Sequence, residues 1–541
     1  MNLKSNENLR ELLETRAAGN SEKTFLFSEN DGRKWTYSEF DKTVNRAANM
    51  LAENGIKKGD VVSLLMPNSA EYIVAYFACW KLGAIANPVN SLLKPEEIAF
   101  VIGNSEAKML LVNSEFQTAI DDIKNDLPNL QTVVNFDDAA KATANFTSDK
   151  LPEINLKKDD EAIIIYTSGT TGKPKGCLLT HGNLIANARQ ITDWLGFGET
   201  DRLLTIMPLF HMNAVSVTTL TALYAGASTV VSPKFSASRF WQIVEDYKVT
   251  SFGSVATMLS MLLQRRSAET SGRGDAETIK NFETENVDSG QLNEKISASP
   301  PLRVSASHQN ALRFAMCGSA PVPAEILRRF EETFDCLVIE GYGLSESTCR
   351  STFNPPNKER RAGSCGKPIG NEMKVFDEND REVSVNQLGE IVLRGENVFK
   401  GYFKNEAATL KAFQNGWFHT GDIGYRDADG FFYIADRKSD MIIRGGENIY
   451  PREIDELLFA HPAIESAAVI GVPDDLYGES VAAFVVLKKG ETTSEEDLIN
   501  FCKKHLADYK CPKTVHFVED IPKGATGKLL KRELARLYGK K

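Results

Sequence analysis

Apolar strand patterns and amphipathic helix patterns alternate along the first part of this sequence, and this alternation constrains the fold more than any other feature. The run 37–55 has apolar residues at helical spacing and ends in glycine, and VVSLLM (61–66) follows it as an apolar strand. Similar strand-like runs recur at MLLV (109–112), AIIIYT (162–167), TSFGSV (250–255) and FAMCGS (314–319). Such alternation is typical of parallel sheets covered by helices, so we predict an α/β fold.

The chain of 541 residues is too long for one ordinary hydrophobic core, so we expect more than one domain. Strand-like runs (SAAVIGV and VAAFVVL) and amphipathic helices in the last part of the chain suffice for a small α+β domain that ends at Lys541. The segment 265–307 is rich in polar residues and glycine and lacks apolar periodicity. We interpret it as a long, flexible surface insertion.

Charge and cysteine spacing exclude several classes of protein. The formal net charge of -10 argues against a nucleic-acid partner, so any phosphate must be held by a local site. The 8 cysteines form no CxxC pair and the 7 histidines no HxxxH motif, which disfavours structural zinc and redox disulfides. The charged N-terminus does not resemble a signal peptide, and Lys81 interrupts the best apolar stretch. We expect a cytoplasmic protein without an integral membrane segment.

The most informative motif is YTSGTTGKPKG (166–176), in which an apolar strand leads into hydroxylated residues, glycines and lysines. Glycines allow the backbone to approach a phosphate, and exposed N–H groups and hydroxyls donate to its oxygens. The spacing differs from a P-loop, because Gly169 and Gly172 are too close and Pro174 follows the lysine. A glycine-rich turn is the plainer alternative, but the composition favours a phosphate-gripping loop.

Further motifs follow in the order PLFHMN (208–213), CGSAP (317–321), EGYGLSEST (340–348), GWFHTGDIG (416–424), DRKSDMIIRGGENIYPREID (436–455) and PKGATGKLLKREL (522–534). Together with YTSGTTGKPKG, they resemble the adenylate-forming superfamily over nearly the whole chain, and specifically its acyl-CoA synthetase branch. Parts of the chain are similar to fatty-acid–CoA ligases, and others to crotonobetaine/carnitine–CoA ligases.

The resemblance implies an N-terminal domain over 1–436, with a β-subdomain, and a mobile C-terminal lid over 437–541. It implies an enzyme that uses ATP and Mg²⁺ to convert a carboxylic acid to acyl-AMP and pyrophosphate, and we expect the acid to be a fatty or other aliphatic acid. The acyl group then passes to coenzyme A. Delivery of the acyl-AMP to another acceptor, such as a carrier protein or an oxygenase-type reaction, is the alternative within the superfamily. A nucleotide sensor without catalysis is the alternative outside it. A homodimer is a further expectation.

The resemblance also assigns roles to individual residues. Glu346 matches the magnesium ligand, Asp422 the acceptor for the ribose hydroxyls, Tyr342 the aromatic residue that packs on adenine, and Lys528 and Thr167 catalytic positions. Other expected nucleotide or coenzyme A contacts are Ser168, Gly169, Thr170, Thr171, Gly172, Lys173, Lys175, Gly318, Ser319, Ala320, Glu340, Gly341, Gly343, Ser345, Ile434, Arg437, Gly445 and Gly446. The expected acyl pocket is lined by His211, Met212, Val215 and Val255.

Two positions depart from the family pattern. Ser345 replaces the usual threonine and keeps its hydroxyl, and Ser439 stands at a hinge position that is commonly aspartate or lysine. The resemblance also makes Arg444, Lys510 and Lys513 candidate partners for the phosphates of coenzyme A. The basic residues that flank Lys528 toward the C-terminus are expected to be exposed to solvent; they are Lys531, Arg532, Lys540 and Lys541.

The role implied for Lys528 gives a test. The ammonium of Lys528 is expected to neutralise charge between the attacking carboxylate and the α-phosphate. Lys528→Ala should therefore slow acyl-adenylate formation by about a hundredfold or more, measured as pyrophosphate release. Thioester formation from supplied acyl-AMP should be retained, and Lys540→Ala serves as the control. Equal loss in both half-reactions would contradict the assignment.

Overall fold

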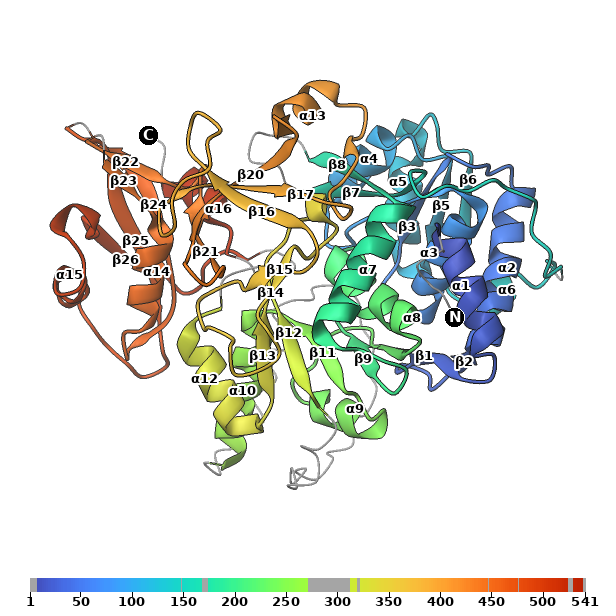
Figure 1. Ribbon diagram of the computed structural model, residues 1–541, viewed down its shortest axis with the longest axis horizontal. Coiled ribbons are helices and arrows are strands. Elements are labelled where there is room, and N and C mark those ends of the chain that lie inside the picture. The colour runs from blue at the N-terminus through green and yellow to red at the C-terminus, as the bar shows by residue number, and fades with distance from the viewer. Residues whose placement is uncertain are drawn as a thin grey trace.

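The computed structural model describes residues 7–146, 148–167, 174–270, 312–318, 322–445, 447–474, 476–523 and 529–538. Two large sheets with their helices make up most of the molecule, and the last strands and helices gather at one end of it (Figure 1). An antiparallel sheet lies between these parts along the chain. The predicted architecture, parallel-rich sheets with a β-subdomain and a small α+β C-terminal part, is confirmed.

The first large sheet has the strand order β13-β12-β11-β9-β10-β1-β2. All of its neighbouring strands are parallel except β1 and β2. Its strands are β1 (Thr24–Ser28), β2 (Lys34–Thr36), β9 (Arg202–Thr205), β10 (Ser228–Val231), β11 (Ser251–Ser254), β12 (Phe314–Cys317) and β13 (Leu337–Glu340). The carboxyl ends of β11, β12 and β13 therefore meet at one edge of the sheet, where the loops that follow them can share a site.

The second large sheet has the order β18-β8-β7-β4-β3-β5-β6. Strands β7, β4, β3, β5 and β6 are parallel to one another, and β8 and β18 add two antiparallel pairings beyond β7. The strands are β3 (Val61–Leu65), β4 (Ile85–Pro88), β5 (Met109–Val112), β6 (Thr132–Asn135), β7 (Glu161–Thr167), β8 (Lys175–Thr180) and β18 (Gly401–Tyr402). One continuous cluster of buried side chains includes residues from both large sheets.

The remaining strands form antiparallel structure. The β-subdomain has the order β16-β17-β20-β19 with β21 beside β20, β14 pairs with β15, and the C-terminal sheet has the order β23-β22-β25-β24 with β26 parallel to β25. Their bounds are β14 (Thr352–Phe353), β15 (Lys367–Pro368), β16 (Glu372–Phe376), β17 (Gly389–Arg394), β19 (Phe413–Gln414), β20 (Trp417–Arg426), β21 (Phe432–Arg437), β22 (Ile442–Arg444), β23 (Glu447–Ile449), β24 (Ile464–Asp474), β25 (Gly478–Leu487) and β26 (Thr514–Phe517). The C-terminal sheet has its own cluster of buried side chains, which supports a separate unit.

The helices begin and end at the residues that the sequence provides for this purpose. In α2, Thr36 and Glu39 form a capping box, and α3 ends at Gly83, which has a φ of 73° that favours glycine. The helices are α1 (Leu9–Gly19), α2 (Tyr37–Glu53), α3 (Ala70–Leu82), α4 (Pro95–Asn104), α5 (Gln117–Ile123), α6 (Ala139–Ala142), α7 (His181–Leu195), α8 (Thr221–Ala225), α9 (Phe240–Asp246), α10 (Ala256–Thr270), α12 (Ala324–Phe334), α13 (Glu406–Ala412), α14 (Pro451–Phe459), α15 (Glu495–Lys503) and α16 (Lys531–Tyr538). A π-helix, η4 (Asn213–Leu220), precedes α8.

One boundary differs from the sequence prediction. The insertion predicted for 265–307 begins inside α10, which continues to Thr270. Helical hydrogen bonding thus extends into residues whose polar composition suggested a loop. Residues 271–311 lie outside the described part of the chain. Within that part, no helix is both long enough and apolar enough to cross a membrane.

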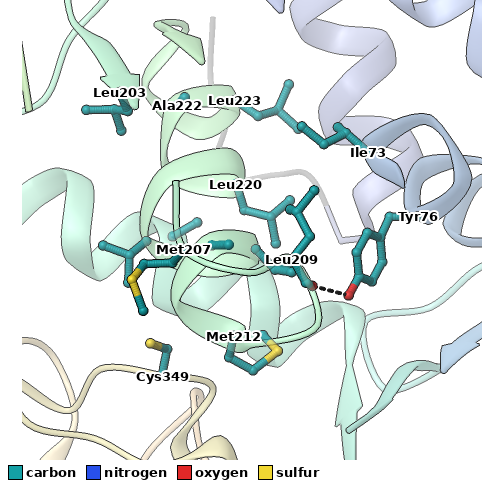
Figure 2. Close-up of a cluster of buried hydrophobic side chains, with 14 of the residues drawn as sticks. Ile73, Tyr76, Leu203, Met207, Leu209, Met212, Leu220, Ala222, Leu223 and Cys349 are labelled. Atoms are coloured by element: carbon teal, nitrogen blue, oxygen red, sulfur yellow. Dashed lines mark hydrogen bonds between the residues drawn. The ribbon is translucent and has the colours of Figure 1, made fainter. Parts of the chain in front are cut away.

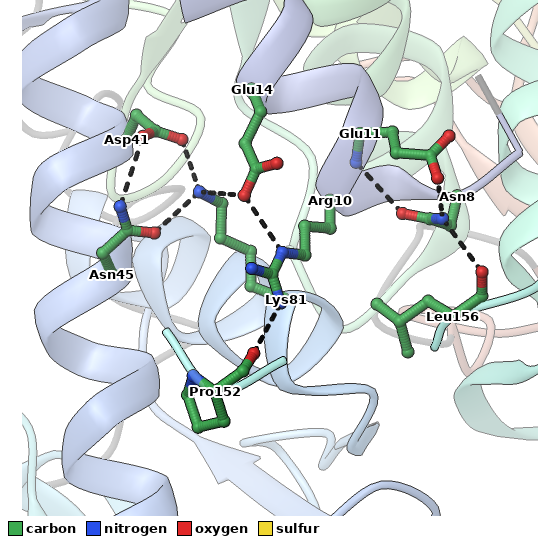
Figure 3. Close-up of polar contacts among 9 residues, drawn as sticks. All are labelled: Asn8, Arg10, Glu11, Glu14, Asp41, Asn45, Lys81, Pro152 and Leu156. Carbon is green, nitrogen blue, oxygen red and sulfur yellow. Dashed lines mark hydrogen bonds and ion pairs between the residues drawn. The ribbon is translucent and has the colours of Figure 1, made fainter. Parts of the chain in front are cut away.

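Helix α3 is buried along its length, including Lys81, the residue that interrupts its apolar sequence. Figure 3 shows the Lys81 ammonium between Asp41, Asn45 and Glu14. Its Nζ donates to Asn45 Oδ1 at 2.7 Å and pairs with the Asp41 carboxylate. A buried ammonium is stable only when it is paired and hydrogen-bonded in this way. The network therefore fixes α3 against α1 and α2.

This network predicts a stability effect. Lys81→Met should lower the free energy of unfolding by about 2 kcal/mol or more, because Asp41 and Asn45 lose their buried partner. Urea denaturation followed by tryptophan fluorescence measures this change. Lys124→Met is a matched control, because Lys124 pairs with Asp121 on the surface, where such pairs contribute little. Indistinguishable midpoints for the two variants would contradict the stabilising role of Lys81.

Candidate active site

The site is built on the loop that follows β13. Glycines in this loop allow two backbone segments to lie close together. Gly341 N–H donates to the Cys317 carbonyl at 2.9 Å, and Ser351 N–H donates to the Tyr342 carbonyl at 2.8 Å. A Cβ at Gly341 would lie 2.5 Å from the Phe353 ring, and one at Gly343 would lie 2.0 Å from the Cys349 carbonyl oxygen. Glycine is therefore required at both positions, and the loop is held close to the ends of β12 and β13.

Three of the predicted nucleotide-binding residues form one hydrogen-bonded group. The Asp422 carboxylate accepts a hydrogen bond from the Tyr342 hydroxyl and pairs with Arg437 Nε at 3.2 Å. Burial and the neighbouring carboxylate raise the pKa of Tyr342, so its hydroxyl remains a donor. Burial alone would lower the pKa of Arg437, but Asp422 raises it and the net shift is upward. The side chains of Asp422 and Arg437 are brought together because β20 and β21 pair at these residues.

Glu346 lies in a second group beside the first. It is in the short 3-10 turn η6 (Ser345–Ser347), and its Oε1 accepts a hydrogen bond from the Tyr402 hydroxyl at 3.0 Å. Lys175 Nζ lies 5.1 Å from the centre of the Tyr402 ring. Burial raises the pKa of the Glu346 carboxyl, whereas the charge of Arg437 acts to lower it. Thr167 is opposite Lys175 in the β7–β8 pair, so both ends of the glycine-rich loop are near this group.

Tyr402 is a functional candidate that sequence reasoning missed. It comes from β18, far from Glu346 in the sequence, and β18 joins β8 so that Tyr402 is opposite Cys177. A lone tyrosine in GYFK carries little sequence signal, and only the pairing of the two strands brings its hydroxyl to the carboxylate. Tyr402 holds the Glu346 side chain in place.

Glu340 and Ile434 form hydrogen bonds to residues outside the two groups described above. Glu340 ends β13 and is buried, and burial raises the pKa of its carboxyl to about 8. Its Oε2 accepts a hydrogen bond from Gly363 N–H at 3.3 Å. The Ile434 carbonyl accepts a hydrogen bond from Arg452 of α14, and Arg452 N–H donates to Asp436 at 2.8 Å. These contacts connect β21 to the C-terminal part of the chain.

The four residues predicted to line the acyl pocket lie near the ends of the same parallel strands. Met212, Val215 and Val255 are buried, and Figure 2 shows Met212 with Met207, Leu209 and Cys349 in one cluster of hydrophobic side chains. Burial lowers the pKa of His211 to about 4, so its imidazole is neutral at physiological pH. Its Nε2 is buried without a hydrogen-bond partner. The arrangement agrees with a packing role for His211 rather than a basic one.

The described residues predicted to contact coenzyme A lie in the C-terminal part of the chain and have protein partners. Gly445 has a φ of 60° in the turn between β22 and β23, and its N–H donates to the Tyr477 carbonyl at 2.8 Å. Arg444 Nη1 donates to the Tyr509 carbonyl at 2.7 Å. Lys510 pairs with Glu453 at 2.7 Å, and Lys513 pairs with Asp474 at 2.8 Å.

Several predicted positions lie outside the described residues: Ser168, Gly169, Thr170, Thr171, Gly172, Lys173, Ser319, Ala320, Gly446 and Lys528. The expectation of solvent exposure is wrong for Lys531. Its side chain is 17% exposed and pairs with Asp455 at 2.6 Å. The amphipathic turn at the start of α16 packs this lysine against the C-terminal domain, so its charge is used for structure.

Comparison with known proteins identifies the class. The family model of AMP-binding enzymes matches residues 13–403, and the model of the AMP-binding enzyme C-terminal domain matches 453–528. The chain therefore belongs to the family of AMP-binding enzymes. The prediction of an AMP-forming acyl-CoA synthetase is confirmed at the level of this class.

Three relatives illustrate the range of the family. Oxalate–CoA ligase from Arabidopsis thaliana is 34% identical over 93% of this chain and 93% of that enzyme. Sulfoacetate–CoA ligase from Cupriavidus necator is 34% identical over 98% of this chain and 97% of its own. Crotonobetaine/carnitine–CoA ligase from Escherichia coli is 32% identical over 99% of this chain and 100% of its own. The crystal structure of ATP-bound MatB from Rhodopseudomonas palustris has a TM-score of 0.86 at 29% identity and covers 98% of this chain and 99% of that one.

The Tyr402–Glu346 contact gives a prediction for the first half-reaction. Tyr402→Phe removes one hydrogen bond to a carboxylate, which is worth about 1.5 kcal/mol, so pyrophosphate release should slow roughly tenfold. Tyr247→Phe is the control, because Tyr247 follows α9 and its ring packs against Phe27. If Tyr402→Phe and Tyr247→Phe release pyrophosphate equally fast, Tyr402 has no positioning role.

Proposed function

We propose that this protein adenylates an aliphatic carboxylic acid with ATP and transfers the acyl group to coenzyme A. The proposal rests on the proximity of the two groups described above, one formed by Tyr342, Asp422 and Arg437 and the other by Glu346 and Tyr402. Arg437 acts electrostatically on both Asp422 and Glu346, so the expected ribose contact and the expected metal ligand lie at one site. A nucleotide bound there would have its sugar at Asp422 and its phosphates toward Glu346.

The residues of this site would act mainly by positioning and by neutralising charge. A carboxylate is a poor acyl donor, so its oxygen must first attack the α-phosphorus and displace pyrophosphate. Tyr342 and Asp422 would fix the nucleoside, while Lys175 and Arg437 supply positive charge near the phosphates. The donor at Tyr342 and the acceptor at Asp422 are already oriented by their mutual hydrogen bond. Such preorganisation lowers the barrier without a general base.

Glu346 fits a magnesium ligand. Burial disfavours its charged form, and a cation would offset that cost. A single carboxylate such as Glu346 suits Mg²⁺, which is usually bound by one or two carboxylates together with phosphate oxygens and water. When bound, Mg²⁺ would neutralise charge on the phosphates of ATP.

The second half-reaction would require movement of the C-terminal domain. We place the hinge at Ser439, whose hydroxyl donates to Asp440 at 3.0 Å in the turn after β21. Rotation of the domain 437–541 against 1–436 would exchange the loop of Lys528 for the β22–β23 turn that contains Gly445 and Gly446. Glycine at that turn lets a slender pantetheine chain pass close to the backbone. The thiol of coenzyme A would then displace AMP from the acyl-AMP.

The acid is aliphatic on this proposal because Met212, Val215 and Val255 are buried around its expected position. The substrate names of relatives differ widely, from oxalate and sulfoacetate to crotonobetaine/carnitine and long-chain fatty acids. A fatty acid is therefore one member of the class to be tested. The residues of the pocket must decide among these acids.

A panel of acids tests the proposal directly. Short, medium, long, aromatic and betaine-type acids are mixed with ATP, Mg²⁺ and coenzyme A, and the release of AMP and pyrophosphate is measured. We expect both products with at least one aliphatic acid, and a loss of activity with EDTA. Pyrophosphate without coenzyme A-dependent AMP release would indicate another acyl acceptor. A flat response across the panel, with no product above background, would contradict the enzymatic function.

A further inference from the structure

Arg350 is a buried cation without an anionic partner. Arg350 is 1% exposed and forms no ion pair among the described residues, and its guanidinium carbon lies 5.5 Å from the centre of the Phe353 ring. Its Nη1 has one long contact, 3.4 Å, to the Cys349 carbonyl, and its Nε and Nη2 have no hydrogen-bond partner. Buried arginines are normally paired, because an unpaired charge costs several kcal/mol. A buried cation without an anionic partner indicates that a bound anionic ligand supplies the missing partner.

The backbone of Arg350 is held firmly, so its position is part of the fold. Asn187 Nδ2 donates to the Arg350 carbonyl at 2.6 Å, and Asn397 Nδ2 donates to the same oxygen at 3.2 Å. The Arg350 Cα would lie 2.9 Å from a Cβ at Gly343, in the loop that carries Tyr342 and Glu346. Arg350 is thus directly behind the nucleotide loop.

The guanidinium of Arg350 lies at the end of β12, beside the expected acyl pocket. A Cβ at Gly318 would lie 2.6 Å from the Gly341 carbonyl oxygen and 2.8 Å from Arg350 Nη2, so glycine is required here and the guanidinium lies close to the backbone. The neighbouring strand β11 shows the same arrangement, because a Cβ at Gly253 would be 2.6 Å from Asn213 Oδ1. The strands β11 and β12 pair in parallel, with Gly253 opposite Met316. Arg350 and Asn213 therefore cover adjacent strand ends.

Further polar atoms near these strand ends are also without partners. Asn213, which begins η4 and is 3% exposed, has neither its Oδ1 nor its Nδ2 hydrogen-bonded. The Ser351 hydroxyl and His211 Nε2 are likewise buried without a partner. Buried polar side chains are rarely left unsatisfied, and several in one region indicate a binding site. Of these groups only Arg350 is charged, since His211 is neutral.

The free atoms of Arg350 define the kind of ligand. Nε and Nη2 lie on one edge of the guanidinium and donate in parallel, which matches the two oxygens of a carboxylate or a sulfonate. An acid with a fixed positive charge would be repelled. A long alkyl chain would leave the guanidinium buried and unpaired. The reacting carboxylate is needed at the α-phosphate, so the anion at Arg350 must be a second group on the same acid.

We propose that the acid activated by this enzyme is a short aliphatic acid with a second anionic group, a carboxylate or a sulfonate, and that Arg350 binds this group. This inference rests on the proposed function and specifies the substrate class of the same site. The acid is short because Arg350 packs against the loop of Tyr342 and Glu346, which leaves little length between the two ends. Asn213 Nδ2, beside the neighbouring strand β11, is buried without a partner and is a candidate second donor for this group.

The test compares acids of equal carbon number with the wild-type enzyme. Oxalate, malonate, succinate and adipate are paired with acetate, propionate, butyrate and hexanoate, and kcat/KM is measured as coenzyme A-dependent AMP release. We expect at least one short diacid to exceed its monoacid by about a hundredfold or more. Sulfoacetate is measured beside malonate, and the better of the two identifies the second group as sulfonate or carboxylate. Preference for monoacids, for hexanoate or for glycine betaine overturns the inference but leaves the ligase function intact. If none of the acids supports AMP release, the proposed function itself is overturned.

Variants assign the preference to Arg350. Arg350→Met should reduce the ratio of diacid to monoacid kcat/KM by about a hundredfold with little change in the KM for ATP, and Arg350→Lys should restore part of it. Arg313→Met is the matched control, because Arg313 precedes β12 at its other end and pairs with Asp201. Equal losses for all acids and for ATP would assign Arg350 to the nucleotide or to stability and overturn the inference. If Arg350→Met does not fold, Asn213→Ala must shift the same ratio.

Discussion

The close approach of two backbone segments, 341–343 and 349–353, is the constraint on which the rest of the site depends. Gly341 and Gly343 have no side chains at this crossing, so the loop after β13 lies flat against the chain that returns beneath it. Tyr342 therefore faces Asp422 on one side, and Arg350 is held behind it on the other. A methyl group at either glycine would push apart the nucleotide contacts and the acyl contacts together, because both are carried by the same few residues.

Three cations in this molecule differ in how their charge is balanced. Lys81 is surrounded by Asp41, Asn45 and Glu14, so its charge serves to fix three helices. Arg437 is paired with Asp422 and remains close to Glu346, so its charge is shared between structure and the site. Arg350 has no such partner. Lys81 and Arg437 are paired within the protein, whereas the proposed partner of Arg350 is a group of the substrate. This difference cannot be read from the sequence.

Much of the fold could be predicted from the sequence, because the apolar runs 61–66, 109–112 and 162–167 are strands and the helix patterns between them are helices. The residues of the nucleotide site could be named from motifs, and the fold brings Tyr342 and Asp422 into contact, while their roles toward the nucleotide stay predictions. Tyr402 and Arg350 could not be named in this way. Their roles depend on strand pairing and on the absence of partners in the folded chain, neither of which leaves a local pattern. The predicted start of the insertion at 265 lies inside α10, because polar residues can continue a helix beyond its apolar turns.

The buried cysteines have a consequence for chemical selectivity. An acyl-adenylate reacts with any thiolate within reach, and Cys317 and Cys349 belong to the same buried cluster as Met212. Burial raises the pKa of Cys317 to about 12 and also raises that of Cys349, so both sulfurs stay protonated. A protonated thiol is a weak nucleophile. Cys317 and Cys349 would therefore be poor acceptors for an activated acyl group compared with the thiol of coenzyme A.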